Sequence, residues 1–467
     1  DEIARYRQDQ PKLSGSYNRA SEAGSIFNVN AAYQIFRRRE SVTTDRTQTG
    51  QPDSFELYDS RENEWNAEFS VDYDFALGGG RLKLIGLQRF EHSPVSDFFG
   101  QTFTDGVTAP NGSRFDRVTD EGESIFRAEY GWKTKGGTDW GFSVEGAYNF
   151  LDNEGALAVL DSQGIFQPVA LTNANSKVTE YRGEFIGSYG RPLLENLSLQ
   201  ATLGGEYSKI SQSGAAGQSR SFVRPKGSVS LAWRPQDDLD VSLKLERSVG
   251  QLNFFDFVES VDVSQNNGNA GNPELVPPQS WRGELEATQK LGPWGSVTVN
   301  IYGEKFSDIV DSIPITATTE ARGNLDSATS YGVEGEVRKS SLNDPVTGVS
   351  RRINDDKIFT YEANFRHDVP GSNWAWGAGV EDFRYSRFLR LDQSNRFRTG
   401  GPYSWIFVEH KDVFGLTVQA NLGNLFGRSE QFTRTVYENR RDGPIALVED
   451  RSREFGLIYR LTVSGSF

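Results

Sequence analysis

Strict alternation of apolar and polar residues over long segments is the feature that most constrains the fold of this chain. Residues 64–75 carry an apolar side chain at every second position, from Trp65 to Phe75, and every residue between is polar or charged. Successive side chains of a β-strand point to opposite faces, so this segment predicts a strand with one apolar and one polar face. The pattern returns at 139–150, 197–207, 239–246 and 454–467. The sequence therefore predicts an all-β protein.

The length of these segments separates two kinds of β protein. Strands of a soluble sandwich usually run about 5–6 residues, whereas a tilted strand needs about 9–11 residues to cross a bilayer. The alternation in 64–75 covers the whole of that longer span. This favours a transmembrane antiparallel up-and-down β-barrel over a sandwich with one buried face.

Short and long connections alternate along the chain. Outer-membrane barrels have short periplasmic turns and longer extracellular loops. Tight turns are predicted at 76–80, 134–138, 190–196, 234–238, 291–295, 369–373 and 411–415, and long polar loops at 37–63, 91–123, 151–177, 208–221, 249–279, 307–328, 385–402 and 425–453. Six of the nine tryptophans lie in or beside the tight turns, as an interfacial aromatic girdle requires: Trp132, Trp140, Trp233, Trp294, Trp374 and Trp376.

The alternation of short and long connections fails once, between residues 307 and 357. There, two long connections follow each other, one on each side of a strand predicted at 329–338. Neighbouring antiparallel strands must reverse direction, so we predict a turn at 342–345 and a further strand at 346–353. With a weaker strand at 11–19, residues 1–467 then form one barrel domain with about 18 to 20 visible strands, out of about 22 when complete.

Composition removes several classes of function. The 467 residues include no cysteine, which excludes disulfides and thiolate chemistry. The formal net charge of −14 argues against binding to nucleic acid. No stretch of 18 apolar residues predicts a transmembrane helix. We find no zinc-ligand spacing and no nucleophile motif, and so expect no metal site, no cofactor and no catalytic residue.

Of the three histidines, His367 and His410 adjoin predicted tight turns and are expected to face water, which leaves His92 as the one that raises a catalytic alternative. His92 and Asp97 share one predicted loop and resemble the acid–base pair of a hydrolase. A solvated loop histidine is the simpler interpretation, because a lone His–Asp pair is weak support for catalysis.

Three segments resemble TonB-dependent outer-membrane receptors. Residues 272–281 are similar to an Asn-Pro-x-Leu-x-Pro-Glu-x-Ser stretch of that family, except that Pro278 stands where an acidic residue is common. Residues 330–336 resemble its strand with Gly-x-Glu, and 421–426 its Asn-Leu-Phe signature. The residues of the first stretch and the terminal aromatic that many outer-membrane barrels share are Asn272, Pro273, Glu274, Leu275, Pro277, Ser280 and Phe467.

The resemblance implies the barrel of a receptor in the outer membrane of a Gram-negative bacterium. Such a receptor imports a scarce nutrient: an iron chelate, a vitamin, an oligosaccharide or a peptide. The expected partners are this small ligand, outer-membrane lipid and lipopolysaccharide, the machinery that reads Phe467, and TonB. The plug domain through which TonB acts has no counterpart before residue 26, so we expect it, with the first strands, upstream of this chain. A passive plugless porin, and an outer-membrane enzyme or adhesin acting through its loops, are the alternatives.

Exposed aromatic residues in two predicted loops are the candidates for ligand contact. Aromatic rings among polar groups stack on sugars or aromatic chelators, although packing of the loops against one another explains them equally well. The candidates are Phe98, Phe99, Phe103 and Arg114 in 91–123, and Phe254, Phe255 and Phe257 in 249–279. Charges expected to face the barrel interior, pairing with a plug or with each other, are Arg182, Lys226, Lys244 and Arg460, alternating with Glu184, Glu206, Glu246 and Glu454.

Overall fold

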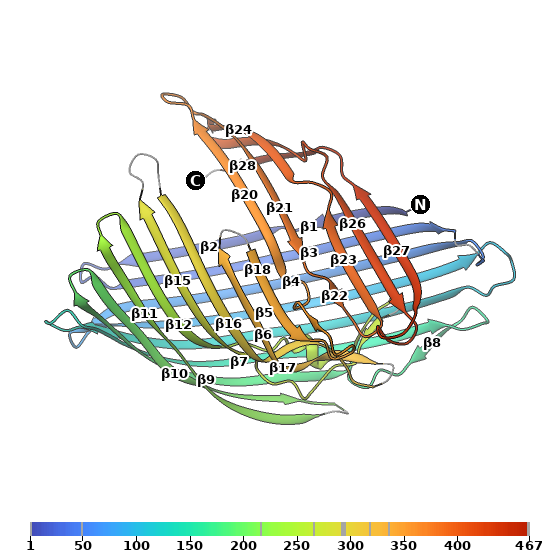
Figure 1. Ribbon diagram of the computed structural model, residues 1–467, viewed down its shortest axis with the longest axis horizontal. Helices are drawn as coiled ribbons and strands as arrows, with labels where there is room; N and C mark the ends of the chain where they lie inside the picture. Colours follow the sequence, from blue (N-terminus) through green and yellow to red (C-terminus); the bar gives the residue numbers. More distant parts are fainter. Residues whose placement is uncertain are drawn as a thin grey trace. The chain divides into compact units, whose positions relative to one another are not determined.

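The computed structural model describes residues 2–47, 50–214, 217–264, 267–290, 296–316, 319–334 and 337–464. In this part of the chain the regular structure is β-strand, apart from the 3-10 helix η1 (Phe254–Phe257) (Figure 1). None of its helices is long and apolar enough to cross a membrane. The chain divides into two compact units: unit 1 is residues 1–281 with 319–324, and unit 2 is residues 282–318 with 325–467.

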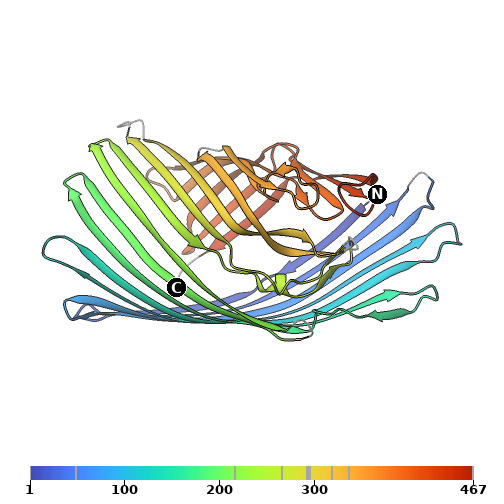
Figure 2. The same ribbon diagram turned by 60° about the horizontal axis from the view of Figure 1, so that its bottom comes forward.

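Unit 1 is an antiparallel meander in which strands that follow one another in the sequence pair side by side. Figure 2 shows its long, curved strands. The strands are β1 (Glu2–Asp9), β2 (Lys12–Ala20), β3 (Ile26–Arg46), β4 (Ser54–Leu77), β5 (Gly80–Phe103), β6 (Asn111–Lys133), β7 (Asp139–Leu160), β8 (Phe166–Val169), β9 (Ser176–Leu194), β10 (Leu197–Gln212), β11 (Gln218–Gln236), β12 (Leu239–Val249), β13 (Ser260–Asp262) and β14 (Asn267–Asn269). β1 and β2 pair with successive parts of one edge of β3.

One face of the unit 1 sheet is apolar and the other is polar, as the alternation predicts. On the first face Phe69 and Phe126 are 48% and 59% exposed. On the second face the buried Glu145 accepts hydrogen bonds from Arg127 (2.7 Å) and Arg182 (3.0 Å). An exposed apolar face opposite a paired polar face is the arrangement of a barrel wall between lipid and an aqueous interior.

Charges predicted for the interior lie on the polar face of unit 1 and pair with one another. Lys226 donates a hydrogen bond to Glu206 (2.9 Å) and contacts Glu184. Lys244 donates to Glu246 at 2.9 Å. These contacts join adjacent strands, the two strands on either side of β10, or residues two positions apart in one strand, so the charges of the wall are neutralised locally.

The tight turns fall where the sequence predicts them, and glycine is required in the first of them. Gly78 and Gly79 form the two-residue connection between β4 and β5, with φ of +55° and +86°. Both central residues of such a hairpin turn need positive φ, which β-branched residues adopt only with strain. Trp132 and Trp140 stack across the next turn, with ring centroids 6.2 Å apart. The turn predicted at 291–295, with Trp294, lies outside the described residues.

Replacing Gly79 with valine is expected to destabilise the β4–β5 hairpin by roughly 1–3 kcal/mol, the cost of holding a branched residue at positive φ. No heavy atom lies within 4 Å of a Cβ built at Gly79, so backbone strain is the whole effect. The urea midpoint of refolded protein measures it. Gly15→Val is the control, since Gly15 also has open space but no positive φ. Equal midpoints for the two variants would contradict the prediction.

Most of the predicted long loops are wrong, because the strands continue through them. β5 extends to Phe103 and β6 begins at Asn111, so the loop predicted at 91–123 is a hairpin with a short tip. The same holds for 37–63, where β3 runs to Arg46 and β4 begins at Ser54. A ladder is held by backbone hydrogen bonds and needs no apolar face, so polar sequence beyond the membrane continues it. The segment 249–279 remains mostly irregular.

Unit 2 contains two further antiparallel sheets, one in the order β20-β21-β24-β25-β28 and one in the order β22-β23-β26-β27. The strands wholly or mostly in this unit are β15 (Gln279–Lys290), β16 (Ser296–Pro314), β17 (Glu320–Glu334), β18 (Val337–Asn343), β19 (Ser350–Arg351), β20 (Lys357–Asp368), β21 (Trp374–Tyr385), β22 (Phe388–Leu389), β23 (Gln393–Thr399), β24 (Tyr403–Val413), β25 (Leu416–Gly423), β26 (Ser429–Tyr437), β27 (Ile445–Glu454) and β28 (Ile458–Ser464).

The turn predicted at 342–345 is present between β18 and β19, which pair antiparallel through Leu342↔Arg351 and Asn343↔Ser350. The structure adds a second reversal, which falls inside the strand predicted at 329–338. The predicted strand 329–338 is split between β17 and β18, which pair antiparallel from Ala328↔Leu342 to Val333↔Val337. The predicted strand 346–353 is reduced to β19. Pro345 lies in the turn before β19, as predicted.

Two further predictions for this half of the chain have different outcomes. The alternation of Arg460 with Glu454 is wrong, because β27 ends at Glu454 and Arg460 lies in β28, in a different sheet. Phe467 lies outside the described residues.

A buried ion-pair network joins several connections of unit 2. The Asp344 carboxylate, 1% exposed, accepts two hydrogen bonds from Arg441 (2.9 and 2.7 Å) and one from Arg351 (2.6 Å). Arg351 also donates to Asp311 at 3.0 Å, and Asn354 donates to the other oxygen of that carboxylate at 2.9 Å. These residues belong to segments up to 130 positions apart, as Asp311 and Arg441 are, so the network fixes the connections as one cluster.

Candidate ligand-binding pocket

A row of acidic side chains crosses four neighbouring strands on the polar face of unit 1. Direct register partners build it: Glu91↔Glu121 and Arg89↔Glu123 between β5 and β6, Glu123↔Asn149 between β6 and β7, and Asn149↔Glu180 between β7 and β9. Residues directly opposite each other in a ladder share one face, so strand pairing alone brings these groups together.

The row is strongly acidic. Arg89 donates to Glu91 at 2.8 Å, and Glu180 accepts from Asn149 (3.0 Å) and Ser208 (2.7 Å). Within the part of the chain that the structure describes, the Glu121 and Glu123 carboxylates have no hydrogen bond or ion pair. The four carboxylates of Glu91, Glu121, Glu123 and Glu180 therefore outnumber the nearby guanidinium groups of Arg89 and Arg117, which leaves the row attractive to a cation.

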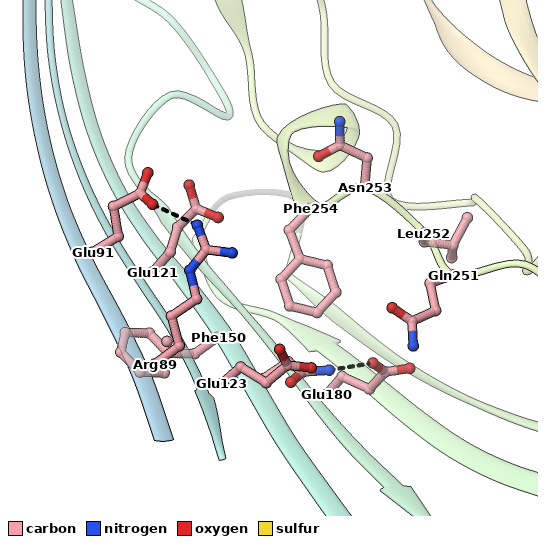
Figure 3. Close-up of a pocket in the computed structure, with 12 residues that line it drawn as sticks. Arg89, Glu91, Glu121, Glu123, Phe150, Glu180, Gln251, Leu252, Asn253 and Phe254 are labelled. Atoms are coloured by element: carbon pink, nitrogen blue, oxygen red, sulfur yellow. Dashed lines mark hydrogen bonds and ion pairs between the residues drawn. The ribbon is translucent and has the colours of Figure 1, made fainter. Parts of the chain in front are cut away.

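The connection between β12 and β15 covers this row and encloses a pocket. Gln251, Leu252, Asn253 and Phe254 lie opposite the acidic side chains, and the cavity between them is about 220 Å³. Figure 3 shows the Phe254 ring between the acidic side chains and Leu252. The Asn253 side chain accepts a hydrogen bond from the Phe255 amide at 3.0 Å and so begins η1.

Buried anchors hold the covering segment on the sheet. Phe257 and Val258 are 2% and 1% exposed. The Gln212 side chain donates to the Phe257 carbonyl at 3.0 Å, and the Arg117 guanidinium lies 5.1 Å from the centre of the Phe255 ring. Burial raises the pKa of Asp256, although the Arg322 guanidinium 3.9 Å away acts in the opposite direction.

The stretch 272–280 anchors the other end of the same segment. Asn272 accepts a hydrogen bond from the Glu274 amide (2.9 Å) and donates to the Arg322 carbonyl (2.9 Å). Leu275 is 1% exposed, and the Ser280 and Ser248 hydroxyls are 2.9 Å apart. In this structure these residues hold the end of the covering segment in place.

The seven predicted contact residues fall into separate groups. Phe98 and Arg114 are register partners on the apolar face, opposite to the pocket, and Arg114 is paired with Asp116 at 2.6 Å. Phe99 and Phe103 occupy the other face of the same hairpin. Among Phe254, Phe255 and Phe257, the structure places the first in the pocket wall, the second beneath Arg117 and the third in the core.

The acid–base pair considered for His92 and Asp97 is not formed. Both residues lie in β5, five positions apart, and therefore point to opposite faces. His92 Nδ1 lies 2.6 Å from an Asp120 oxygen, and the Tyr58 hydroxyl donates to Asp97 at 3.3 Å. No group of three or more His, Asp or Glu side chains among the described residues is arranged to hold a metal ion.

Sequence reasoning missed the acidic row. Glu91, Glu121 and Glu123 mark the limits of a segment predicted as a loop, and Glu180 lies far along the chain. The available signal was that Glu91 and Glu123 each stand directly beside a predicted strand, next to Phe90 and Ser124. Their meeting depends on register, which the sequence does not specify where polar strands extend.

Comparison with known proteins identifies the family and the fold of the chain. Residues 5–405 match the family model described as TonB dependent receptor-like, beta-barrel. No curated protein matches the sequence significantly. The fold is similar to that of the siderophore receptor PiuA from Acinetobacter baumannii, with a TM-score of 0.59, 11% identity, and coverage of 99% of this chain and 80% of that one.

Two other solved structures show the same likeness. The ferric-catecholate import receptor Fiu from E. coli K12, in its closed form, gives a TM-score of 0.57 at 10% identity over 99% of this chain and 81% of its own. The copper transporter OprC gives 0.52 at 12% identity over 99% and 80%. At such identities the likeness concerns the fold alone.

Proposed function

We propose, from the premise that this chain belongs to the TonB-dependent receptor β-barrel family, that it binds and imports a scarce nutrient that carries a cationic group. The chain is an all-β transmembrane barrel of the Gram-negative outer membrane. The acidic pocket beneath Phe254 is the observation that carries the proposal on the ligand.

The pocket lies on the side of the wall that a ligand in transit would meet. In a transmembrane barrel the apolar face is turned to lipid and the polar face to the interior. Glu121 and Glu123 are on the polar face, as is the segment that holds Phe254. A ligand that passes through the interior therefore meets carboxylates and an aromatic ring together.

The composition of the pocket specifies a class of ligand. Carboxylates attract an ammonium or guanidinium group, and the Phe254 ring offers apolar contact and a cation–π surface. A cavity of about 220 Å³ accommodates one such group of a larger molecule. A basic peptide or an amine-bearing chelate fits this description. The solved receptors for a ferric catecholate and for siderophores are consistent with a chelate.

Charge removal in the pocket tests the ligand class. The receptor in its native membrane is titrated with peptides that differ only in lysine or norleucine at one position. Glu121→Gln with Glu123→Gln is expected to weaken binding of the lysine peptide by at least about 10-fold. Glu22→Gln with Glu195→Gln removes the same charge from exposed turns and should change nothing. Equal affinity for lysine and norleucine would contradict the proposal.

The energy source is tested separately, in cells with and without TonB. Import of the bound ligand should stop when TonB is deleted or the proton gradient is collapsed. Import that persists in both conditions, together with steady ion conductance in a planar bilayer, would mean a passive porin. Chemical conversion of the ligand would instead favour an outer-membrane enzyme. Retention of the ligand at the loops without import would favour an adhesin.

A further inference from the structure

Three aromatic side chains follow one another on the inner face of the sheet β20-β21-β24-β25-β28 in unit 2. They are Tyr403, Trp405 and Phe407, at alternate positions of β24, and are called the aromatic stripe below. Ile406 and Val408 of the same strand point the other way and are 45% and 50% exposed, as residues turned to lipid are. Because side chains alternate between the faces of a strand, the stripe is turned to the barrel interior.

Two rings of the stripe lie on glycines of the neighbouring strand. Trp405 and Phe407 are the register partners of Gly379 and Gly377 in β21. A Cβ atom built at Gly379 would stand 2.2 Å from the Trp405 ring, and one built at Gly377 would stand 2.4 Å from the Phe407 ring. These rings therefore cover the backbone of β21, and both are half-buried. One face of each ring is thus left to the interior.

Tyr403 repeats the arrangement on the other side, in β25. A Cβ atom built at Gly423 would stand 3.0 Å from the Tyr403 ring. Glycine weakens a strand relative to alanine, and within a strand it often marks a place that a ligand approaches closely. Three glycines beneath three rings therefore indicate a surface shaped for a ligand, despite the loss of strand stability.

Polar side chains border the stripe on both sides. Glu381 in β21 is the register partner of Tyr403, and Asn421 in β25 is the register partner of Phe407. Within the residues that the structure describes, the side chains of Glu381 and Asn421 have no hydrogen bond or ion pair. A carboxylate and an amide beside open ring faces offer hydrogen-bond acceptors and a donor to a ligand that lies on the rings.

The charged groups at the tight-turn end of the stripe are paired with one another. The Arg366 guanidinium lies 5.5 Å from the centre of the Phe407 ring, and it donates to Asp368 at 3.1 Å. It also contacts Glu409, whose side chain is only 14% exposed. This guanidinium is therefore occupied, which disfavours an anion as the ligand of the stripe.

We propose that the aromatic stripe binds an uncharged oligosaccharide. The C–H groups on the face of a sugar ring pack on an aromatic ring, and the hydroxyls around its edge hydrogen-bond to an amide and a carboxylate. The centroids of the Tyr403 and Trp405 rings are 5.7 Å apart, so consecutive sugar units of one chain contact consecutive rings. The site lies in unit 2 and does not depend on the acidic pocket of unit 1 or on the cationic group proposed for its ligand.

Titration calorimetry of the full-length receptor with maltohexaose and with cellohexaose tests the proposal, in a detergent that contains no sugar. At least one of these glucose hexamers should bind. Trp405→Leu keeps an apolar side chain and should weaken that binding by about 10-fold. Trp376→Leu is the matched control, because Trp376 is the register partner of Val408 on the lipid face of the same sheet and is 46% exposed. It should bind as the unaltered receptor does.

A glycine variant separates ligand contact from a purely structural explanation, in which the rings only shield the glycines. In Gly379→Ala the new Cβ lifts the Trp405 ring from the backbone, so binding of the hexamer should fall by about 10-fold. Hydrogen exchange along β21 and β24 should stay unchanged, which shows that the sheet is intact. Trp405→Tyr keeps a flat ring and should retain most of the affinity.

Four results would overturn the proposal. Neither hexamer binds the unaltered receptor, Trp405→Leu binds as tightly as Trp376→Leu, Gly379→Ala keeps its full affinity, or polyethylene glycol of similar length binds as well as the hexamer. The third result would assign the rings a structural role alone. The fourth would mean that the stripe is an apolar surface that does not recognise sugar hydroxyls.

Discussion

Asp344→Ala is expected to loosen the connections of unit 2, at a cost of about 3–5 kcal/mol in the free energy of local opening. The change leaves Arg441 and Arg351 buried without their shared carboxylate, and it removes the acceptor for the Val346 and Thr347 amides (3.0 and 2.8 Å). Hydrogen exchange of these two amides and of residues 438–444 measures the loss. The control is Asp368→Ala.

Asp368 has ion pairs with Arg366 (3.1 Å) and Lys411 (2.6 Å), but its side chain is 52% exposed. Water replaces those contacts, so we expect little change in exchange for the control. Similar exchange in the two alanine variants would mean that burial of the Asp344 network contributes nothing to the free energy of local opening.

The same carboxylate gives the network a defined pH dependence. Burial raises the pKa of Asp344, but hydrogen bonds from Arg441, the Thr347 amide and Arg351 outweigh it and bring the pKa to about 2, below the ordinary 3.8. A depressed acid pKa stabilises the folded form above the ordinary value and loses this contribution as the pH falls towards 2. The protection factors of residues 344–351, which are exchange rates corrected for the intrinsic pH dependence of amide exchange, should therefore be constant from pH 7 to 5 and fall between about pH 4 and 2. In Asp344→Asn that fall should be absent.

Phe257→Ala is expected to release the segment that covers the acidic pocket. Removing a buried phenylalanine costs about 3–5 kcal/mol, and Phe257 is 2% exposed at the point where η1 meets the sheet. Without it the position of Phe254, whose ring centroid lies 6.3 Å away, is no longer fixed. We expect faster hydrogen exchange over 250–259 and weaker binding of the lysine peptide.

Phe254→Ala is the matched comparison. Phe254 lines the cavity and is only half-buried, so its loss should weaken ligand binding while exchange over 250–259 stays unchanged. The two phenylalanines of one short helix are thus assigned different roles. If both variants release the segment equally, the assignment of Phe254 to ligand contact fails.

The sequence was most informative where one face of a strand meets lipid. The strands predicted at 64–75 and 139–150 are the tight-turn halves of β4 and β7, because a lipid-facing side chain is needed at every second position there. Beyond the membrane that requirement ends. The hairpin of β5 and β6 from 91 to 123 is held by backbone hydrogen bonds that place no demand on side-chain polarity, so its sequence resembles a loop.

The pocket was harder to predict than the strands for a related reason. Phe254 was identified because aromatic residues are conspicuous in a polar segment, but its partners Glu121 and Glu180 come from strands that join it only through register and through the fold of the covering segment. A shift of one residue in any pair would move a carboxylate to the lipid face. The contrast between Phe254 and Phe257 depends on burial, which a sequence of alternating polar and aromatic residues does not reveal.

The extension of the β5–β6 hairpin beyond the membrane has a practical consequence for engineering. A strand of 24 residues spans about 80 Å, and the hydrocarbon core is only about 30 Å thick. Residues 104–110 therefore end a stiff arm whose two strands are paired almost to the tip. Exposed tips tolerate inserted sequence, so a foreign epitope placed there is carried clear of the cell surface without disturbing the pairing that builds the pocket.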